Sequence, residues 1–353
     1  MSPHHNARAQ QQNNRLLVTG TVLFYLVAAL AMVMANKWVL KTTSAPLFFL
    51  FTQLVIAVVL FLVSHAVGLV QIPLYVDGQL IKGLAANVGL NVIGLSFSNY
   101  TLKYVDASFY QIARGLLLPF TVATSYVFLH ARPSSRIFVS CSVVTMGFLV
   151  GVFMDAIPIS PFGITFGIIS SAITAVHSVV IKKSLDVVHG SAMHLSWYTN
   201  LLSAVVMIPL VLLAGEGPAV FDLFFGPSPI VPVQGELSAL NTFIWGSLIT
   251  GSVGFLMSLA SVLSIKVTSP ITHMVSSAVR GVAASLLGMW LFGDILSGGR
   301  ISSIAIILGG SIYYTWIKHV ESQGQKPDGN VAKYERVPLE DVEAGNGTPT
   351  KPE

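Results

Sequence analysis

Long apolar runs separated by short polar breaks extend along most of the chain, from about residue 16 to residue 318. A helix needs about 20 mostly apolar residues to cross the hydrocarbon core of a bilayer, and ten runs are close to or above that length. The breaks contain Pro, Gly or charged residues, as expected of connections between membrane helices. The ten expected spans are residues 16–36, 46–70, 79–101, 106–129, 134–154, 161–181, 194–214, 239–264, 270–292 and 299–318.

The composition supports an all-α integral membrane protein. Hydrophobic residues make up 53% of the 353 residues and charged residues only 10%, and the mean hydropathy is +0.74. A soluble domain carries about 25% charged residues. We therefore expect a lipid bilayer around the protein and no nucleic-acid partner. The single cysteine, Cys141, lies inside an apolar run, which excludes a disulfide framework.

The ends of the chain differ from this apolar body. Residues 1–15 read as a short N-terminal segment, and residues 321–353 as a polar, disordered tail rich in Gly, Pro and Lys. The first apolar run is long for a signal peptide and lacks a small-residue cleavage pattern, so we interpret it as a helix.

Basic residues are distributed unevenly between the connections. With ten spans and a cytosolic start, nine basic residues fall on the cytosolic side and four on the opposite side. Because basic residues concentrate on the cytosolic side of membrane proteins, both termini are predicted to be cytosolic. The cytosolic set is Arg8, Arg15, Lys82, Arg132, Arg136, Lys182, Lys183, Lys266 and Lys318, and the opposite set is Lys37, Lys41, Lys103 and Arg300.

An internal repeat relates the two halves. A shift of 162 residues lays YVDASFYQIARGLLLPFTVATSYVFLH, from Tyr104, over KVTSPITHMVSSAVRGVAASLLGMWLF, from Lys266. Each segment has a polar turn followed by an apolar helix with one arginine. Five helices per half would place the second half upside down, as in many secondary transporters. We expect inverted repeats over residues 16–158 and 159–320, with a substrate cavity between them.

Two arginines inside apolar spans carry the main chemical signal. Arg114 and Arg280 each cost roughly 2.5–3.5 kcal/mol near a bilayer centre, so each needs a partner or a water-filled cavity. A buried ion pair is the bland explanation, but every Asp and Glu falls at a span end, in a connection or in a tail. Two buried positive charges without a buried acid indicate an anionic ligand. The same absence favours exchange of anions over proton coupling.

Helical spacing adds polar neighbours to the arginines. His273 and Ser277 share a face with Arg280, and Tyr110 shares a face with Arg114. His177 and His273 are candidates for proton relay, but a helix histidine is more often structural. Ser277, Gly281 and Ser285 form a row of small residues, which is more typical of close helix packing.

Two further sites have both a structural and a functional interpretation. Lys182 and Lys183 follow the sixth span and read either as snorkelling anchors or as phosphate ligands. Trp197-Tyr198-Thr199-Asn200 opens the seventh span, where aromatic residues form interfacial belts, yet the amide of Asn200 also suits a nucleobase edge. No GxxxxGK, HExxH or CxxC motif occurs. The sequence therefore gives no reason to expect catalysis, a metal or a cofactor.

Specific motifs resemble a known superfamily. The stretch 266–273, KVTSPITH, followed by Val275 and Arg280, resembles the ninth helix of the nucleotide-sugar and triose-phosphate translocators of the drug/metabolite transporter superfamily. Leu102-Lys103-Tyr104-Val105 with Phe109, Tyr110 and Arg114 resembles the fourth-helix region. The Trp197 motif is similar to the Phe-Tyr-Asn-Asn motif that reads guanine in GDP-sugar carriers. The resemblance covers residues 16 to 320.

Within that superfamily the sequence most resembles the GDP-fucose transporter branch, where one basic residue and then a small one follow SPLTHNV. Arg280-Gly281 reproduces this pattern, with arginine for lysine. Triose-phosphate carriers have a Lys-Arg pair there, so Gly281 removes their second charge, and the Gly-Ala-Leu-Asn-Lys motif of GDP-mannose carriers is absent. Thr199 and Trp197 depart from the guanine motif.

The resemblance implies ten helices in two inverted repeats around a central cavity, and a Golgi or endoplasmic reticulum antiporter. It would carry a nucleotide sugar, GDP-fucose, into the lumen in exchange for a nucleoside monophosphate, GMP. Arg280 and Arg114 would neutralise the diphosphate. The other expected ligands are Tyr110 and His273 as hydrogen-bond partners, Asn200 and Tyr198 at the base, Ser276 and Ser277 at phosphate or sugar hydroxyls, and Lys182 at a phosphate.

Other interpretations stay open at this level. The same fold could exchange a UDP-sugar or a phosphorylated metabolite, and a non-transporting scaffold would use the tail from Glu321 to bind partners. The sequence leaves open whether two copies form a homodimer.

Overall fold

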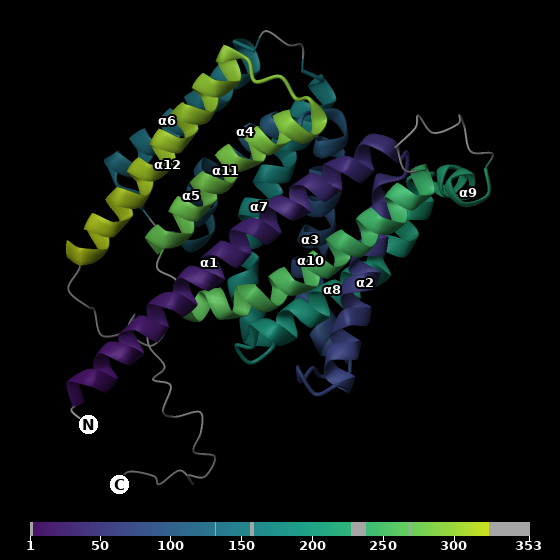
Figure 1. Ribbon diagram of the computed structural model, residues 1–353, viewed down its shortest axis with the longest axis horizontal. Coiled ribbons are helices and arrows are strands. Elements are labelled where there is room, and N and C mark those ends of the chain that lie inside the picture. The colour runs from purple at the N-terminus through teal and green to yellow at the C-terminus, as the bar shows by residue number, and fades with distance from the viewer. Residues whose placement is uncertain (1–2, 131, 156–158, 227–237, 268–269, 325–353) are drawn as a thin grey trace.

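The computed structural model describes residues 3–130, 132–155, 159–226, 238–267 and 270–324, and within them it is built from helices (Figure 1). The helices are α1 (Pro3–Thr42), α2 (Pro46–Ala66), α3 (Gly78–Tyr104), α4 (Ala107–Gly115), α5 (Leu117–Leu129), α6 (Ser135–Phe153), α7 (Pro161–Val187), α8 (Ala192–Leu213), α9 (Gly217–Phe225), α10 (Ala239–Val267), α11 (Pro270–Phe292) and α12 (Gly298–Gly324). The all-helical expectation is confirmed for this part of the chain. The predicted tail from residue 325 lies outside it.

Seven of the described helices are long and apolar enough to cross a membrane. They are Val22–Thr42, Pro46–Ala66, Gly78–Tyr104, Ser135–Phe153, Pro161–Val187, Ala192–Leu213 and Ala239–Ser258. Each overlaps one of the ten predicted spans, so the protein is an integral membrane protein by length and composition of its helices. The other three predicted spans stay predictions.

Those three spans differ from the seven in identifiable ways. The run 106–129 is divided into α4 and α5 at Leu116, and neither piece reaches 18 residues. Pro119 accounts for the break, because its ring displaces the carbonyl of Gly115 and it has no N–H to donate. In α11 the apolar stretch among the described residues is Val279–Phe292. Serine, glycine and tyrosine lower the hydropathy of α12, which is absent from the seven.

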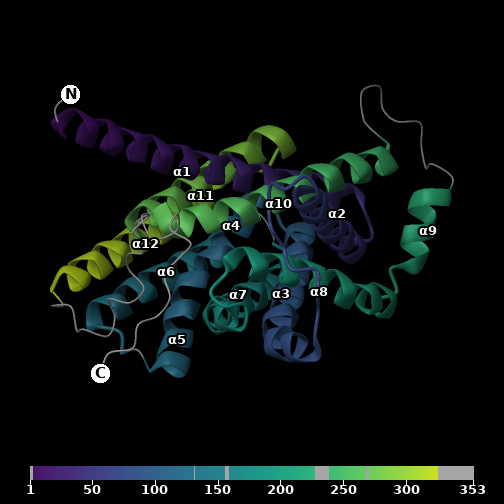
Figure 2. The same cartoon turned by 90° about the horizontal axis from the view of Figure 1, so that it is seen from below.

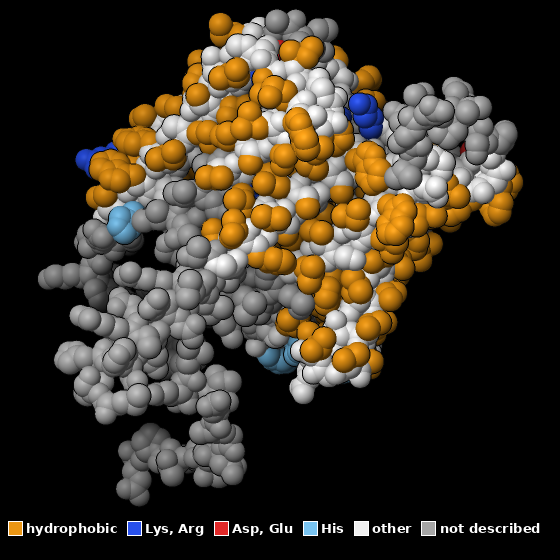
Figure 3. Space-filling view, in the orientation of Figure 1, with side chains coloured by type: hydrophobic (Ala, Val, Ile, Leu, Met, Phe, Trp, Pro, Cys, Tyr) orange, Lys and Arg blue, Asp and Glu red, His pale blue; other side chains and the backbone are white. Residues whose placement is uncertain are grey.

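Hydrophobic side chains cover the outside of the bundle. Val59, Leu62 and Val63 of α2, Phe138 of α6 and Trp290 of α11 are all exposed. Figure 3 shows hydrophobic side chains spread over one face, with few Lys and Arg side chains near its edges. This surface is the one that a bilayer would solvate, since lipid tails replace the core that a soluble protein builds inside.

Helices from the two halves of the chain pack against each other throughout the bundle. The most extensive contacts are those of α3 with α7, α6 with α12, α1 with α10 and α2 with α10, followed by α2 with α8. The α6–α12 pair runs side by side at one edge (Figure 1), and α9 lies away from the bundle beyond the ends of α8 and α10 (Figures 1 and 2).

Small residues bring α6 and α12 together. A Cβ on Gly147 would lie 2.8 Å from Ile307 Cγ1 and 3.1 Å from the Ile307 backbone nitrogen. Two serines then bond across the pair in reciprocal fashion: Ser140 donates to the Gly310 carbonyl at 2.8 Å, and Ser303 donates to the Gly147 carbonyl at 2.6 Å. The contact therefore combines close backbone approach with satisfied hydroxyl groups.

A charged cluster closes one end of the bundle. Arg300, at the start of α12, is 2% exposed and pairs with Asp106 at 2.8 Å and with Asp155 at 2.5 Å. Lys37, near the end of α1, donates to the carbonyls of Leu102 and Val105 at 2.9 and 2.5 Å, where α3 ends. Arg300 therefore joins α12 to the connections before α4 and after α6, and Lys37 joins α1 to the end of α3.

Asp294 adds a carboxylate to the same end, in the connection before α12. It accepts the backbone N–H of Ala107 at 3.0 Å, at the first turn of α4. Burial raises the pKa of Asp294, and the nearby charge of Asp106 acts in the same direction.

Candidate functional site

A cavity of about 320 Å³ lies at the centre of the bundle. Nine of the described helices, α1, α2, α3, α4, α5, α7, α8, α10 and α11, contribute residues to its lining, so both halves of the chain build it. Among the described residues its lining includes Arg114 and Arg280 and contains no Asp or Glu. The polar residues that line this central cavity are Tyr25, Asn36, Gln53, Asn91, Ser98, Asn99, Tyr110, Arg114, Ser170, Ser171, Thr174, His177, Asn200, Thr250 and Arg280.

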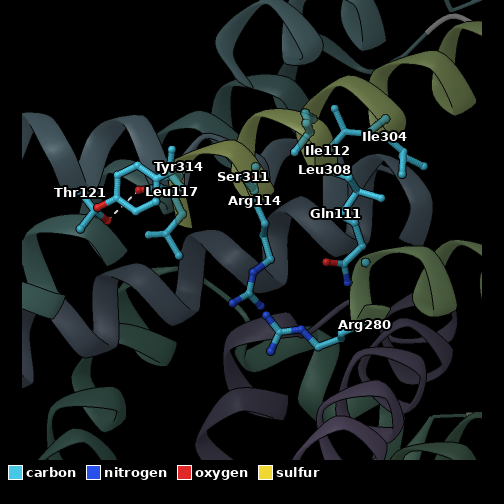
Figure 4. Close-up of a pocket in the computed structure, with 14 residues that line it drawn as sticks. Gln111, Ile112, Arg114, Leu117, Thr121, Arg280, Ile304, Leu308, Ser311 and Tyr314 are labelled. Atoms are coloured by element: carbon cyan, nitrogen blue, oxygen red, sulfur yellow. Dashed lines mark hydrogen bonds between the residues drawn. The ribbon is translucent and has the colours of Figure 1, made fainter. Parts of the chain in front are cut away.

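A second cavity, of about 290 Å³, lies beside the first and shares both arginines with it. This side cavity is lined by residues of α4, α5, α11 and α12 and is mostly apolar, with Ile304, Ile307 and Leu308 on α12. Figure 4 shows the guanidinium groups of Arg114 and Arg280 pointing toward each other, with Gln111 extending toward Arg280. The two positive charges therefore stand at the junction of the two spaces.

Arg114 is held by neighbours on its own side of the cavity. One guanidinium nitrogen donates to the hydroxyl of Tyr110 at 3.3 Å, and the guanidinium carbon lies 5.6 Å from the centre of that ring. The Tyr110 hydroxyl is in turn 2.7 Å from Ser98 Oγ on α3. These contacts fix the direction of Arg114 without neutralising its charge.

Among the residues that the structure describes, no carboxylate pairs with either arginine of the cavity. The two ion pairs found among the described residues both involve Arg300 of α12, which lies near the first turn of α4, whereas Arg114 lies in the last turn of α4. Two like charges at close range in a medium of low dielectric constant repel each other strongly. An anion bound between them relieves that repulsion and supplies the counter-charge, so the geometry suits phosphate-bearing ligands.

The other polar end of the central cavity is neutral. Asn87, which is 1% exposed, donates from Nδ2 to Thr199 Oγ1 at 2.8 Å, and its Oδ1 lies 3.0 Å from His177 Nε2. Asn91 donates to Ser203 Oγ at 3.0 Å. We call these side chains of α3, α7 and α8, together with Asn200 next to Thr199, the amide end of the cavity.

Four of the predicted site residues come together here. Arg280, Arg114, Tyr110 and Asn200 all line the central cavity. His273, Ser276 and Ser277 belong to α11, but their side chains lie outside the described part of the protein.

Two predicted residues lie elsewhere. Tyr198 is 1% exposed, and its hydroxyl donates to the carbonyl of Tyr75 at 2.9 Å, in the connection between α2 and α3. Lys182 is exposed near the end of α7. Tyr198 and Asn200 are two positions apart, so a helix turns their side chains to different faces, and only Asn200 reaches the cavity.

The cavity also contains polar residues to which the sequence interpretation assigned no contact with the ligand; among them, His177 was considered as a proton relay or a structural residue. Ser170, Ser171, Thr174 and His177 form one stripe along α7, and Asn91 and Ser98 lie on α3. Spacings of three, four and seven residues inside otherwise apolar runs were the available signal. Small hydroxyl residues are common in membrane helices for packing reasons, which is why the signal is weak without a partner surface.

Comparison with known proteins agrees with this architecture. A GDP-fucose transporter of Dictyostelium discoideum is 28% identical, over 86% of this chain and 81% of its own. A Golgi GDP-fucose transporter of Drosophila melanogaster is 26% identical, over 89% of this chain and 95% of its own. An uncharacterised transporter of Schizosaccharomyces pombe is 30% identical, over 90% of this chain and 80% of its own.

One solved structure resembles the chain at a TM-score of 0.45 and 18% identity, over 88% of this chain and 99% of the other, which is too low to support an argument. The model of the Triose-phosphate Transporter family matches residues 16–315. That match includes every described residue that lines the central cavity, both arginines among them. The chain therefore belongs to the Triose-phosphate Transporter family.

Proposed function

We propose that this protein is a nucleotide-sugar antiporter that moves GDP-fucose, or a related GDP-sugar, from the cytosol into the Golgi or endoplasmic reticulum lumen in exchange for GMP. The observation that carries the proposal is the Arg114–Arg280 pair in a cavity whose described lining residues include no acid. The diphosphate of the incoming substrate and the monophosphate of the outgoing one are both anions that such a pair binds.

Similarity to named transporters supports the cargo and the compartment. The Dictyostelium and Drosophila relatives are both named GDP-fucose transporters, and the name of the second includes the Golgi. Family membership supports transport rather than catalysis. The choice of a GDP-sugar also agrees with Gly281, which leaves one basic residue where triose-phosphate carriers have two.

The pairing of helices supports two inverted repeats, over residues 16–158 and 159–320. When the first five spans are mapped in order onto the last five, the α3–α7 pair corresponds to α10–α1, and the α5–α7 pair to α11–α1. All four pairs are in contact. The pairs α2–α8, α4–α11 and α6–α12 map onto themselves and are also in contact. A two-fold axis in the membrane plane produces this pattern and permits alternating access.

The distribution of charge supports cytosolic termini. Lys37 and Arg300 lie together at one end of the bundle, which on this orientation is the lumenal end. Lys182 lies at the end of α7, on the side assigned to the cytosol. The amide end of the cavity is then nearer the cytosol, because α7 runs from Pro161 at the lumenal side to Val187.

A second candidate is exchange of a UDP-sugar or of a triose phosphate or other phosphorylated metabolite by the same fold. The description of the matching family favours it. A UDP-sugar carrier would use the same arginine pair for phosphate and select uracil, whereas a carrier of phosphorylated metabolites would use the pair without recognising a nucleobase.

The test is uptake of radiolabelled GDP-fucose into proteoliposomes that contain the purified protein and are preloaded with GMP, UMP, phosphate or buffer. We expect stimulation by GMP. We expect Arg280→Ala to lower uptake roughly 10- to 100-fold, because a charge-assisted hydrogen bond contributes about 1.5–3 kcal/mol. Arg136→Ala, which removes an exposed arginine at the start of α6, is the matched control.

Each alternative result has a distinct meaning. Stimulation by UMP or by phosphate, but not by GMP, would move the cargo to the second candidate. Normal uptake by correctly inserted Arg280→Ala protein would contradict the assignment of the arginine pair to the substrate.

A further inference from the structure

The central cavity has two chemically different ends at a defined separation. Ser171 donates to the Ala113 carbonyl at 2.9 Å, which places it beside Arg114, and His177 lies six residues further along α7. On α3, Ser98 contacts Tyr110, and Asn91 lies seven residues away. At 1.5 Å per residue both helices give about 9–10 Å between the charged end and the amide end. A nucleotide with phosphate at the arginines therefore extends its base toward the amide end.

The side chains at the amide end present hydrogen-bond acceptors. Asn200 donates from Nδ2 to the Ser196 carbonyl at 2.8 Å, and because a carbonyl only accepts, this bond fixes the amide orientation. Asn91 likewise uses its Nδ2 on Ser203. Both residues line the cavity, and no partner for either carbonyl oxygen is found in the described part of the chain, so each can accept a hydrogen bond from a ligand.

His177 contributes a third acceptor through its bond to Asn87. With Asn87 Nδ2 on Thr199, the oxygen that faces His177 Nε2 can only accept, so Nε2 carries the hydrogen. In the neutral ring Nδ1 is then an acceptor. Asn87 is buried behind the histidine and does not line the cavity, so it acts as a positioning residue.

This pattern discriminates between nucleobases. Guanine carries two adjacent donors, N1–H and the 2-amino group, whereas uracil has one N–H between two carbonyl oxygens. Hypoxanthine, the base of IMP, has the N1–H but lacks the 2-amino group. An end with three acceptors therefore matches guanine best, and its oxygens repel the carbonyls of uracil.

We propose that His177, oriented by Asn87 and Thr199, is a base-recognition residue that acts with Asn91 and Asn200 to select guanine nucleotides. The proposal rests on the proposed function, and it names α3 and α7 as sources of base specificity beside the motif that opens α8. It also gives Thr199 a role: its hydroxyl fixes the amide of Asn87 rather than contacting the base.

The test is counterflow of radiolabelled GMP in proteoliposomes, with external GMP, IMP and UMP as competitors. For the wild-type protein we expect half-inhibition by GMP at a roughly tenfold lower concentration than by IMP or UMP, since a site built for a donor rejects analogues that lack it. In His177→Phe and in Asn87→Leu that advantage should fall to about twofold or less. His177→Gln, which retains a carbonyl acceptor, should recover part of it.

His194→Phe, a change at the start of α8 outside the cavity, is the matched control and should keep the wild-type ratios. Wild-type ratios in both His177→Phe and Asn87→Leu would overturn the inference and leave nucleotide exchange intact. Stronger inhibition by UMP than by GMP would also overturn it. If none of the nucleotides supports counterflow, the proposed function itself is contradicted. If His177→Phe fails to fold, Asn87→Leu and His177→Gln decide.

Discussion

At the scale of single residues, the sequence reveals those site residues whose burial in a membrane span costs the most free energy. Arg114 and Arg280 stand out because a charge inside an apolar span requires an inward direction, and both line the central cavity. Asn87 and Asn91 were harder to find, because an uncharged amide in an apolar run has no comparable cost. Their role depends on hydrogen bonds to residues of α7 and α8, and a single sequence does not show which residues of α3 contact these helices.

Asp294 offers a test of burial at the charged end of the bundle. Its pKa is raised, so the stability linked to this carboxyl is greatest at low pH and declines as pH rises through the folded-state pKa. Asp294→Asn keeps an acceptor for the Ala107 N–H without a charge. We expect the melting temperature of the variant in detergent, relative to wild type, to increase as pH rises from about 4, the ordinary pKa of an aspartate, to neutral pH. A difference that shrinks with pH would contradict the assignment.

At the scale of helices, the length and hydropathy of an apolar run predict where a helical segment lies better than they predict whether that segment is one unbroken helix. The apolar run 106–129 reads as one span, yet it forms α4 and α5, and this break leaves Arg114 in the last turn of α4 beside the cavity. The connection between α8 and α10 contains no predicted span, yet the short helix α9 occupies Gly217–Phe225 within it. Three phenylalanines in nine residues give α9 an apolar surface without the length of a span.

The α6–α12 contact makes a testable claim about small residues. Gly147→Ala places a methyl group 2.8 Å from Ile307 and should reduce the free energy of unfolding by about 1–3 kcal/mol through overpacking. Gly89→Ala, in the middle of α3 with no heavy atom within 4 Å of the added Cβ, is the control. It should be neutral or stabilising by up to about 1 kcal/mol, because alanine is the better helix former. Thermal unfolding of the two variants in detergent is the measurement, and equal effects would count against the packing argument.

At the scale of the whole molecule, the two ends of the bundle are built differently. One end holds the buried Arg300 with two carboxylates and the Lys37 bonds to the end of α3. No comparable ion pair is found among the described residues at the opposite end, where Lys182 is exposed. Sequence alone assigned these charges to sides of the membrane, but the partners of Arg300 are 145 and 194 residues away and no local pattern reveals them.

If alternating access operates, the Arg300 end must part during each cycle. Asp106→Asn removes the more exposed of its two carboxylates and leaves Asp155 in place. In a Cys141→Ser background, a cysteine at Thr174 in the cavity should then react several-fold faster with an impermeant maleimide added on the Arg300 side. Asp186→Asn, an exposed carboxylate at the far end of α7, should leave that rate unchanged. Equal rates in the two variants would show that Asp106 does not hold this end closed.

A tryptophan near the start of α8 can report conformational change through its fluorescence. Trp197 donates its indole N–H to the Pro73 carbonyl at 2.8 Å and is 3% exposed, so the connection between α2 and α3 is tied to α8 through a fluorophore. Separation of that connection from α8 would expose the indole to water and shift its emission to longer wavelength. With the other four tryptophans replaced by phenylalanine, one intrinsic chromophore would report, in real time and without a label, when this end of the protein opens.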